Sequence, residues 1–444
     1  MPEPTLSSPS SPPPDRPPLR LRRATRDRVT PVPARLDALL PDDHLARLLW
    51  EAVAQLDLSA FAAGLKVVEG GPGRAAADPQ LLVALWLFAT TQGVTSARAL
   101  DRLCVEHLAY LWLCGGVTIN YHTLSDFHVA HREALDDLMT QVLGRLRHAG
   151  LVAFDQVAQD GIRVRASAGA ASFRRQPTLE KALLEAEALL AAVQAGAHPA
   201  DAPPPTARQQ AARTRAARER VERTKAALAG MPAARAAKQP GQEDEARVST
   251  TDPEARVMKM PDGGFRPAYN VELAADTAEQ VIAGVDVTTS GSDAAQAAPM
   301  VTQVRRRADG RLPRQWSMDG GFANGPAIDA IDDLTAAELE VLAPVQTPKN
   351  PQRDPHQPLP GDSVAVAAWR VRMGTEAAKA AYKLRAATIE CVNAKARMQH
   401  GLTLLRVRGL AKVRCIALWV AVAHNLKLLV RRPPQPTPAL AGAA

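Results

Sequence analysis

The stretch Tyr382–Arg397, YKLRAATIECVNAKAR, decides how the rest of the chain is interpreted. It contains no proline or glycine and is predicted to be helical. Glu390 is its only carboxylate, and from Lys395 to the C-terminus the chain has nine Lys/Arg and no Asp or Glu. A solvated helix face usually alternates the two signs of charge. We therefore expect Glu390 to bind a metal ion that contacts a phosphate, together with two acids from elsewhere in the chain.

The composition fits a cytosolic globular protein with a polyanionic partner. The 444 residues, 46% of them hydrophobic, suffice for two to four domains. The net charge of +8 favours nucleic acid, although Ala- and Arg-rich drift in a GC-rich genome explains the charge equally well. Four scattered cysteines without a CxxC pair suggest neither a zinc site nor a disulfide framework. The apolar runs are too short to cross a bilayer, so we expect no membrane segment and a cytoplasmic location.

The two ends of the chain are predicted to be disordered, and the first third between them is predicted to be helical. Residues 1–33, rich in Pro and Arg, and residues 433–444 are predicted to be disordered tails. Residues 34–150 are predicted to form an all-helical domain. Three of its histidines lie near one another without an acid or a thiol at ligand spacing, so they are expected to be surface polar residues rather than metal ligands; they are His122, His128 and His131.

A helix-turn-helix outline lies inside this helical region. Asp78-Pro79 begins an apolar helix, a short turn follows at 93–96, and Ser96 caps a second helix that extends to His107. Arg98 and Arg102 lie on one side of that second helix. The outline indicates contact with DNA through these two arginines, although many helical hairpins of this kind bind nothing.

The pattern changes to a strand at Leu151. Residues 157–164 alternate apolar and polar side chains, and Asp160-Gly161 interrupts them. An acid inside a strand indicates either a hairpin turn or a bound group, and the residues alone leave both open. Arg163 and Arg165 follow immediately and add a basic cluster.

The remaining segments predict a helical insertion and the rest of a sheet. Residues 176–250 are of low complexity and are predicted to form a protruding helical hairpin, whose Arg-rich face either contacts DNA or is solvated. Two alternating runs around Asp276–Glu279 pair as a β-hairpin. A strand at Gln315–Met318 ends at Asp319, followed by two glycines, and ligands bind at this end of strands in α/β sheets.

Three acids are therefore expected to converge: Asp160, Asp319 and Glu390. Strand, hairpin, helix, strand and helix is the order expected of a ribonuclease H-like α/β core, with a mixed sheet and flanking helices. Three carboxylates on such a core can hold two divalent cations that serve an in-line displacement at phosphorus. Mg²⁺ suits all-oxygen ligands, and Mn²⁺ can replace it.

At these residues the chain resembles bacterial insertion-sequence transposases of the DDE type, in the group named after insertion sequence eleven-eighty-two. The resemblance covers roughly residues 35–432. Its motifs are QDGIRVRASAG (159–169), SFRR (172–175), TTDPEARVMKMPDGGFRPAYN (250–270), SMDGGFAN (317–324), the stretch at 382–397, LRVRGLAKVR (405–414) and AHNLKLL (423–429).

The resemblance implies roles for particular residues. Asp160 and Asp319 would be the catalytic aspartates and Glu390 the catalytic glutamate, while Tyr382, Arg385 and Arg397 would serve DNA. The last position usually holds Lys, and Arg keeps the charge with a different phosphate geometry. Arg397 shares the face of Glu390 on an ideal helix. Arg385 falls off that face, so it is expected before the helix proper or against a flanking phosphate.

The resemblance also implies an organisation and partners. Residues 34–150 would recognise the ends of the element, and residues 151–432 would form the catalytic domain with 176–250 inserted. The expected partners are double-stranded DNA, as terminal inverted repeats and target, and a second copy of the chain. The protein would act in the bacterial cytoplasm at the nucleoid. Two alternatives stay open, namely a catalytically inactive, repressor-like DNA-binding copy and a structure-specific nuclease with the same core.

Overall fold

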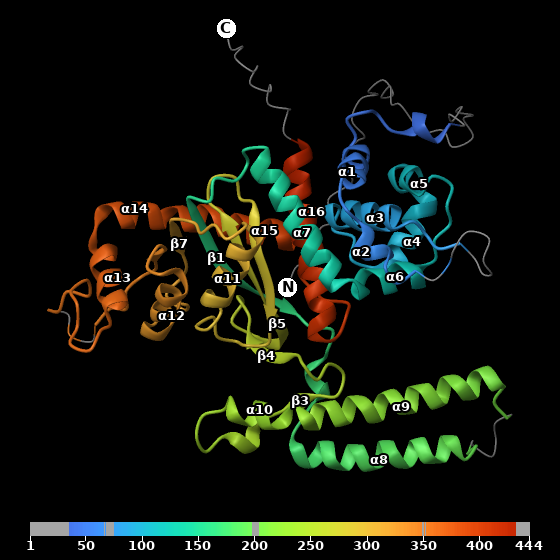
Figure 1. Cartoon of the computed structure of the whole chain (residues 1–444). Coiled ribbons are helices and arrows are strands. Elements are labelled where there is room, and N and C mark those ends of the chain that lie inside the picture. The colour runs from blue at the N-terminus through green and yellow to red at the C-terminus, as the bar shows by residue number, and fades with distance from the viewer. Residues whose placement is uncertain are drawn as a thin grey trace, which may run out of the picture.

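The computed structural model describes residues 35–65, 67, 75–197, 204–348, 350 and 352–431 (Figure 1). The predicted tails at 1–33 and 433–444 lie outside the described residues. Helices cover a mixed sheet in the middle of the chain, and a two-helix arm extends from it.

The N-terminal region is helical, as predicted. Asp78 caps α3 and Ser96 caps α4, each by accepting a hydrogen bond from a backbone N–H of the first turn. Both caps are the residues expected from the sequence. The elements are η1 (Leu36–Leu39), α1 (Leu45–Ala54), α2 (Ser59–Ala62), α3 (Pro79–Thr91), α4 (Ala97–Glu106), α5 (Leu108–Cys114), α6 (Tyr121–Ala130) and α7 (Arg132–His148).

The expectation of surface histidines was wrong for His128. Its ring is buried and stacks on Trp86, with 3.5 Å between ring centroids and 2° between planes. Burial lowers the pKa of His128 to about 3, so the imidazole is neutral in the folded protein. The reason is tertiary: α3 is buried nearly all round, and the facing residues of α6 become core whatever their polarity.

In the described part of the chain, six strands form one mixed sheet. β1 (Gln156–Arg165) pairs antiparallel with β5 (Phe265–Asp276), which pairs on its other edge with β4 (Arg256–Lys259) and β6 (Ile282–Thr288). On its opposite edge β1 runs parallel to β7 (Gln315–Ser317), and β7 runs parallel to β8 (Glu340–Leu342). The predicted β5–β6 hairpin is thus confirmed.

The two faces of β1 point to different helices. Gln159 points to the start of α11 (Ala297–Arg307), where its Nε2 donates to the Gln296 carbonyl at 3.3 Å. Gln156, on the other face, donates to the Ala381 carbonyl of α14 (Glu376–Arg385) at 3.0 Å. Asp160 has the same parity as Gln156 and therefore faces α14. The remaining helices after β7 are α12 (Gly325–Thr335), α13 (Val364–Gly374), the π-helix η4 (Ala386–Glu390), α15 (Cys391–Met398) and α16 (Leu410–Arg431).

Helix α16 joins the N-terminal helices to the sheet. The Asn425 side chain accepts from the backbone N–H of Ile282 and donates to its carbonyl, so it occupies the open edge of β6. One hydrophobic core runs from α1 through α16 into the sheet without a break at residue 150. By length and composition α16 could span a membrane, yet 67% of its most apolar window is buried inside the protein.

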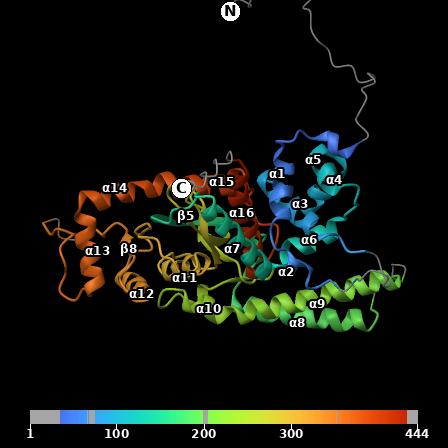
Figure 2. The ribbon, with the colours of Figure 1, turned by 45° about the horizontal axis from the view of Figure 1, so that its top comes forward.

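The predicted insertion is a helical arm. Short strands β2 (Phe173–Arg174) and β3 (Val248–Ser249) form its base, and the helices are α8 (Gln176–Gln194), α9 (Ala207–Ala229) and α10 (Met231–Ala236). Its own small core includes Leu179, Ala227 and Met231. The two views place α8–α9 on one side of the sheet and α14–α15 on the other (Figures 1 and 2).

Candidate active site

Asp160 lies in the middle of an uninterrupted strand. β1 keeps its pairing with β5 across this point, with Asp160 opposite Leu273 and Gly161 opposite Glu272. A hairpin turn at Asp160-Gly161, which the sequence left open, is therefore excluded. The polar side chain is in the strand because it faces α14 and α15 rather than because the chain reverses there.

The sheet brings Asp319 level with Asp160. The parallel pairing of β1 and β7 matches Gln156 with Gln315 and Ala158 with Ser317. β7 ends at Ser317, and the same register continued for two residues would bring Asp319 level with Asp160; Asp319 is near enough to raise the pKa of Asp160. Asp319 then turns the chain, because its Oδ1 accepts the backbone N–H of Gly321 at 2.8 Å.

Gly161 is required by the network on the opposite face. A Cβ at this position would lie 2.7 Å from Oδ1 of Asn270 and 2.9 Å from Oε1 of Glu272, and both residues are buried. Asn270 donates to Asp293 at 2.7 Å, and Arg163 makes an ion pair with Asp293 at 3.0 Å. This buried network supports the part of β1 that carries Asp160.

The segment around Glu390 contacts both oxygens of Asp160. Nη2 of Arg385 lies 3.2 Å from one oxygen, and Nδ2 of Asn393 donates to the other at 2.9 Å. Arg385 was expected to fall off the face of Glu390. The structure places it at the end of α14, in contact with Asp160, directly before the five residues Ala386–Glu390, which form a π-helix whose hydrogen bonds connect residues five apart.

The π-turn changes the angles around the helix axis. On a regular α-helix, five residues separate Arg385 and Glu390 by about 140°. One surplus residue taken up by the π-turn reduces the separation to about 40°. Arg385, Asn393 and Arg397 consequently lie toward Asp160, and Glu390 is exposed about 40° from Arg385 around the axis.

The three predicted acids all act electrostatically on Tyr382. Burial raises the pKa of Tyr382, and the nearby Arg385 guanidinium opposes the rise. Three carboxylates add to the rise, and they are those of Asp319, Asp160 and Glu390. The structure thus places all three acids within electrostatic range of Tyr382, although Glu390 itself is exposed.

Burial also raises the pKa of Asp160, whose side chain is 22% exposed. The Arg385 guanidinium opposes this rise, while the neighbouring Asp319 adds to it. Burial lowers the pKa of Arg397, and Asp160 opposes that change. Arg385 and Arg397 therefore both stabilise the charged form of Asp160.

The other predicted DNA contacts lie at three places. The Arg163 guanidinium belongs to the network with Asp293 and Asn270 described above. Arg165 is exposed at the end of β1, where its backbone pairs with residues 403–405. On α4, Arg98 is exposed with its guanidinium 5.0 Å from the Tyr121 ring centre, and Arg102 is exposed too.

Three site residues were missed from the sequence. Asn393 could have been found from the sequence, since it lies three residues after Glu390 on the same predicted helix. Glu272 had a weaker signal, as an acid in the interior of a strand. The carboxylate of Asp293 accepts hydrogen bonds from Asn270 and Arg163. Burial and the neighbouring Asp293 raise the pKa of Glu272 to about 8.

The donor chemistry fits a divalent cation. Asp160 and Asp319 supply carboxylates on one face, and Oδ1 of Asn393 is buried beside them without a hydrogen-bond partner. All-oxygen donors of this kind suit Mg²⁺. Among the residues the structure describes, no three His, Cys, Asp or Glu side chains are close enough to form a complete metal cage. For all three predicted acids to share an ion, they have to come closer together than they lie in this structure.

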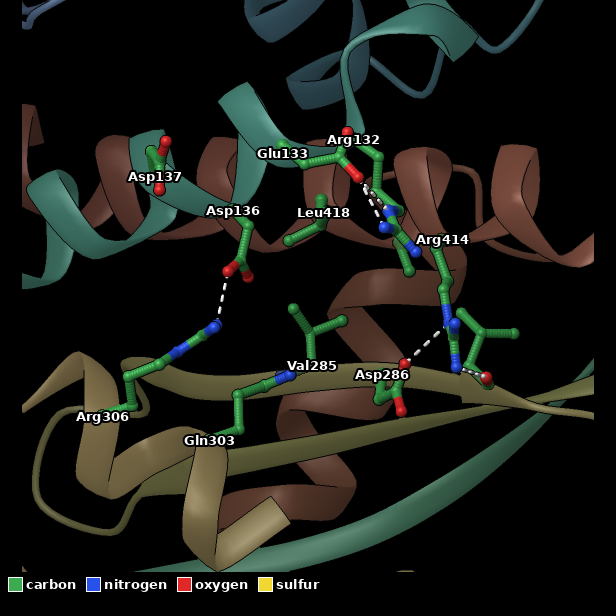
Figure 3. Close-up of a pocket in the computed structure, with 12 residues that line it drawn as sticks. Arg132, Glu133, Asp136, Asp137, Val285, Asp286, Gln303, Arg306, Arg414 and Leu418 are labelled. Atoms are coloured by element: carbon green, nitrogen blue, oxygen red, sulfur yellow. Dashed lines mark hydrogen bonds and ion pairs between the residues drawn. The ribbon is translucent and has the colours of Figure 1, made fainter. Parts of the chain in front are cut away.

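A cavity of about 440 Å³ lies elsewhere, between α7, β6, α11 and α16 (Figure 3). Its charges are largely paired: Asp136 with Arg306 and Arg307, and Asp286 with Arg414. None of the predicted site residues lines it. We assign it to the attachment of α7 to the sheet rather than to the reaction.

Comparison with known protein families gives two matches. Residues 34–129 match a family described as "Transposase domain (DUF772)", and residues 359–430 match one described as "Transposase DDE domain". The second match contains Tyr382, Glu390 and Arg397, whereas Asp160 and Asp319 lie outside both. No curated protein and no solved structure matches the chain.

The two matches define the class of the protein. The chain is a metal-dependent enzyme that cuts DNA and transfers its strands. More particularly, it is a DDE transposase of an insertion sequence.

Proposed function

We propose that Asp160, Asp319 and Glu390 are the catalytic acids of this transposase and bind its metal ions. The observation that carries the proposal is the arrangement around Tyr382. Asp160 lies on β1, Asp319 follows the end of the parallel strand β7, and the segment that carries Glu390 contacts Asp160 through Arg385 and Asn393. The carboxylates of all three affect the pKa of the same phenol.

The proposal includes a ribonuclease H-like core. Its support is the strand order β6-β5-β1-β7-β8, with an antiparallel hairpin on one side of β1 and parallel strands on the other. Asp160 lies on the central strand and Asp319 at the end of its parallel neighbour. Residues 34–150 would be the end-recognition domain and 151–432 the catalytic domain, with 176–250 inserted.

The proposed cofactor is Mg²⁺, as two divalent cations, with Mn²⁺ as a substitute. Asp160, Asp319 and Glu390 would hold them, and Asn393 offers a further oxygen. When bound, such ions activate the attacking oxygen and stabilise the leaving one. In the chain itself, Arg385 and Arg397 favour the charged form of Asp160 against the effect of burial, and Asn393 orients its carboxylate.

The DNA contacts proposed for the site are Tyr382, Arg385, Arg397, Arg163 and Arg165, with Arg98 and Arg102 at the element ends. The nucleophile is water in the cleavage step and a DNA 3′-hydroxyl in strand transfer. The protein would work as a homodimer on terminal inverted repeats and target DNA, in the bacterial cytoplasm at the nucleoid. It would belong to the group of insertion sequence eleven-eighty-two.

Replacing Asp319 by Asn tests the assignment. The variant keeps the size and backbone hydrogen bond of the side chain but loses its charge. We expect it to bind an element-end duplex like the wild type in a mobility-shift assay and to lose Mg²⁺-dependent cleavage. Asp333→Asn, an exposed residue of α12, is the matched control and should cleave normally. Retained cleavage by Asp319→Asn would refute the assignment.

The same assay separates the two alternatives. A repressor-like copy would bind the ends without any metal-dependent nicking by the wild-type chain. A structure-specific nuclease would cut the duplex but give no strand-transfer products with target DNA.

A further inference from the structure

We infer that the α8–α9 arm is a second DNA-binding surface, which grips the phosphate backbone of a duplex through α9. The inference rests on the proposed function only in taking DNA as the substrate. It assigns a role to residues 207–229, which neither family match covers.

The charge of the arm is strongly unequal between its two helices. α9 contains seven basic residues and two glutamates, which gives it a net charge of +5; the basic residues are Arg208, Arg213, Arg215, Arg218, Arg220, Arg223 and Lys225. α8 contains Lys181 and three glutamates, a net charge of −2. A helical hairpin that only needed to be soluble would interleave the two signs.

Most of these cations are free to meet a ligand. Within the described residues only Arg223 and Lys225 of α9 make ion pairs, with Glu219 and Glu187. The other five arginines are exposed. They lie on one helix and are not neutralised by α8, so a polyanion would meet an uncompensated positive surface.

The arm is built to hold this surface in place. α9 packs along α8, Ala217 and Val221 are among its buried residues, and the base of the arm is buried around Leu179 and Met231. The capping box at Thr206 and Gln209 fixes the first turn of α9. A rigid helix loses little conformational entropy when it binds, in contrast to a mobile basic tail.

The size and location of α9 match a duplex. Its 23 residues extend over about 34 Å, one turn of B-DNA. The arm follows the C-terminal end of β1, and Asp319 follows the C-terminal end of the parallel strand β7, so both leave the sheet at the same end. Because α8–α9 and α14–α15 lie on different sides of the sheet, the duplex on α9 would be a segment apart from the one at the active site.

A second copy of the chain fits the surface less well. Two α9 helices repel each other, and the net charge of α8 balances less than half of that on α9. A duplex presents one negative charge per roughly 1.7 Å of its axis, enough for each exposed arginine on the side of α9 that faces it. Charge complementarity therefore favours DNA.

The test compares two double variants of the full chain. Arg213→Gln/Arg220→Gln removes two charges seven residues apart on α9, and Gln keeps helix propensity. Arg311→Gln/Arg314→Gln is the control, since these exposed arginines lie just before β7, at the opposite end from Asp319. Binding to a 30-base-pair duplex without element sequence is measured by fluorescence anisotropy from 50 to 300 mM KCl.

We expect the arm variant to lower the slope of log K against log salt by about 1.8, since each phosphate contact contributes about 0.9. At 100 mM KCl its affinity should fall roughly tenfold or more. The control should keep the wild-type slope and affinity. An arm variant with an unchanged slope and a native circular-dichroism spectrum would overturn the inference. A changed sedimentation coefficient with unchanged DNA binding would assign the arm to self-association instead.

These outcomes are independent of the proposed catalytic site. If the wild type cleaves DNA and the arm variant keeps the wild-type slope, the proposed catalytic function stands and the DNA-binding role of α9 is refuted. If the arm variant has a lower slope and the wild type does not cleave, the DNA-binding role of α9 stands and the proposed catalytic function is refuted.

Discussion

Deletion of Ala386 should leave the active-site face of α14–α15 intact, because η4 contains one residue more than a regular helix needs there. The Ala386 side chain is exposed, and it lies in the π-turn between Arg385 and Glu390. Removing it converts the turn to α geometry. Arg385 and Glu390 are then four residues apart, with about 40° between them around the axis.

The matched control is deletion of Ala394, which is also exposed but lies in the regular helix α15. No surplus residue exists there to absorb the loss. Arg397 should therefore rotate by about 100° and shift by about 1.5 Å relative to Glu390. A misplacement of about 1 Å at a reacting centre can reduce a rate by about a hundredfold.

Cleavage of an element-end duplex with Mg²⁺ measures the outcome, and urea unfolding checks the fold of each variant. The Ala386 deletion should cleave within a few-fold of the wild type, whereas the Ala394 deletion should lose about a hundredfold or more. If both deletions fold and lose cleavage equally, the π-turn does not set the register of Arg385, and our account of the site is wrong.

Three further predictions concern stability and are measured by urea unfolding. Gly161→Ala should cost about 1–3 kcal/mol because its methyl group meets buried Asn270, and adding Asn270→Ala should cost less than the sum of the two single changes. Asp136→Ala should cost about 3–5 kcal/mol because it leaves the fully buried Arg307 without its carboxylate, whereas replacing both residues by Leu should recover most of that loss. His128 binds a proton near pH 6.5 when unfolded but only near pH 3 when folded, so stability falls as pH drops below 6.5; His128→Phe should flatten that fall by up to about 1.4 kcal/mol per pH unit. An equally steep fall in the variant would contradict the burial of a neutral imidazole.

The sequence predicted those parts of the fold that depend on neighbours along the chain. The caps at Asp78 and Ser96 are local, since each side chain bonds a backbone N–H within three residues. The strand at 157–164 and the β5–β6 hairpin follow from alternation of side chains over a few residues. The insertion was recognisable from its composition.

What the sequence could not predict depends on pairing across long distances. His128 is buried because α3 packs against α6, and no local pattern indicates this stacking on Trp86. The ion pair of Arg163 with Asp293 needs two segments that are 130 residues apart. The π-turn could not be predicted from periodicity either, because a periodicity argument assumes a rotation of 100° for every residue and leaves no place for an extra one.

The π-turn also explains how acids outside the matched family region are tied to the one inside it. Glu390 lies within residues 359–430, whereas Asp160 and Asp319 reach the site through the sheet. The link between the two groups is Arg385 and Asn393, which hold the two oxygens of Asp160 from either side of the turn. Without the surplus residue, Arg385 and Asn393 would point about 80° apart and could not both reach one carboxylate. The extra residue in the helix is therefore what lets a single segment present Glu390 and hold Asp160 at the same time.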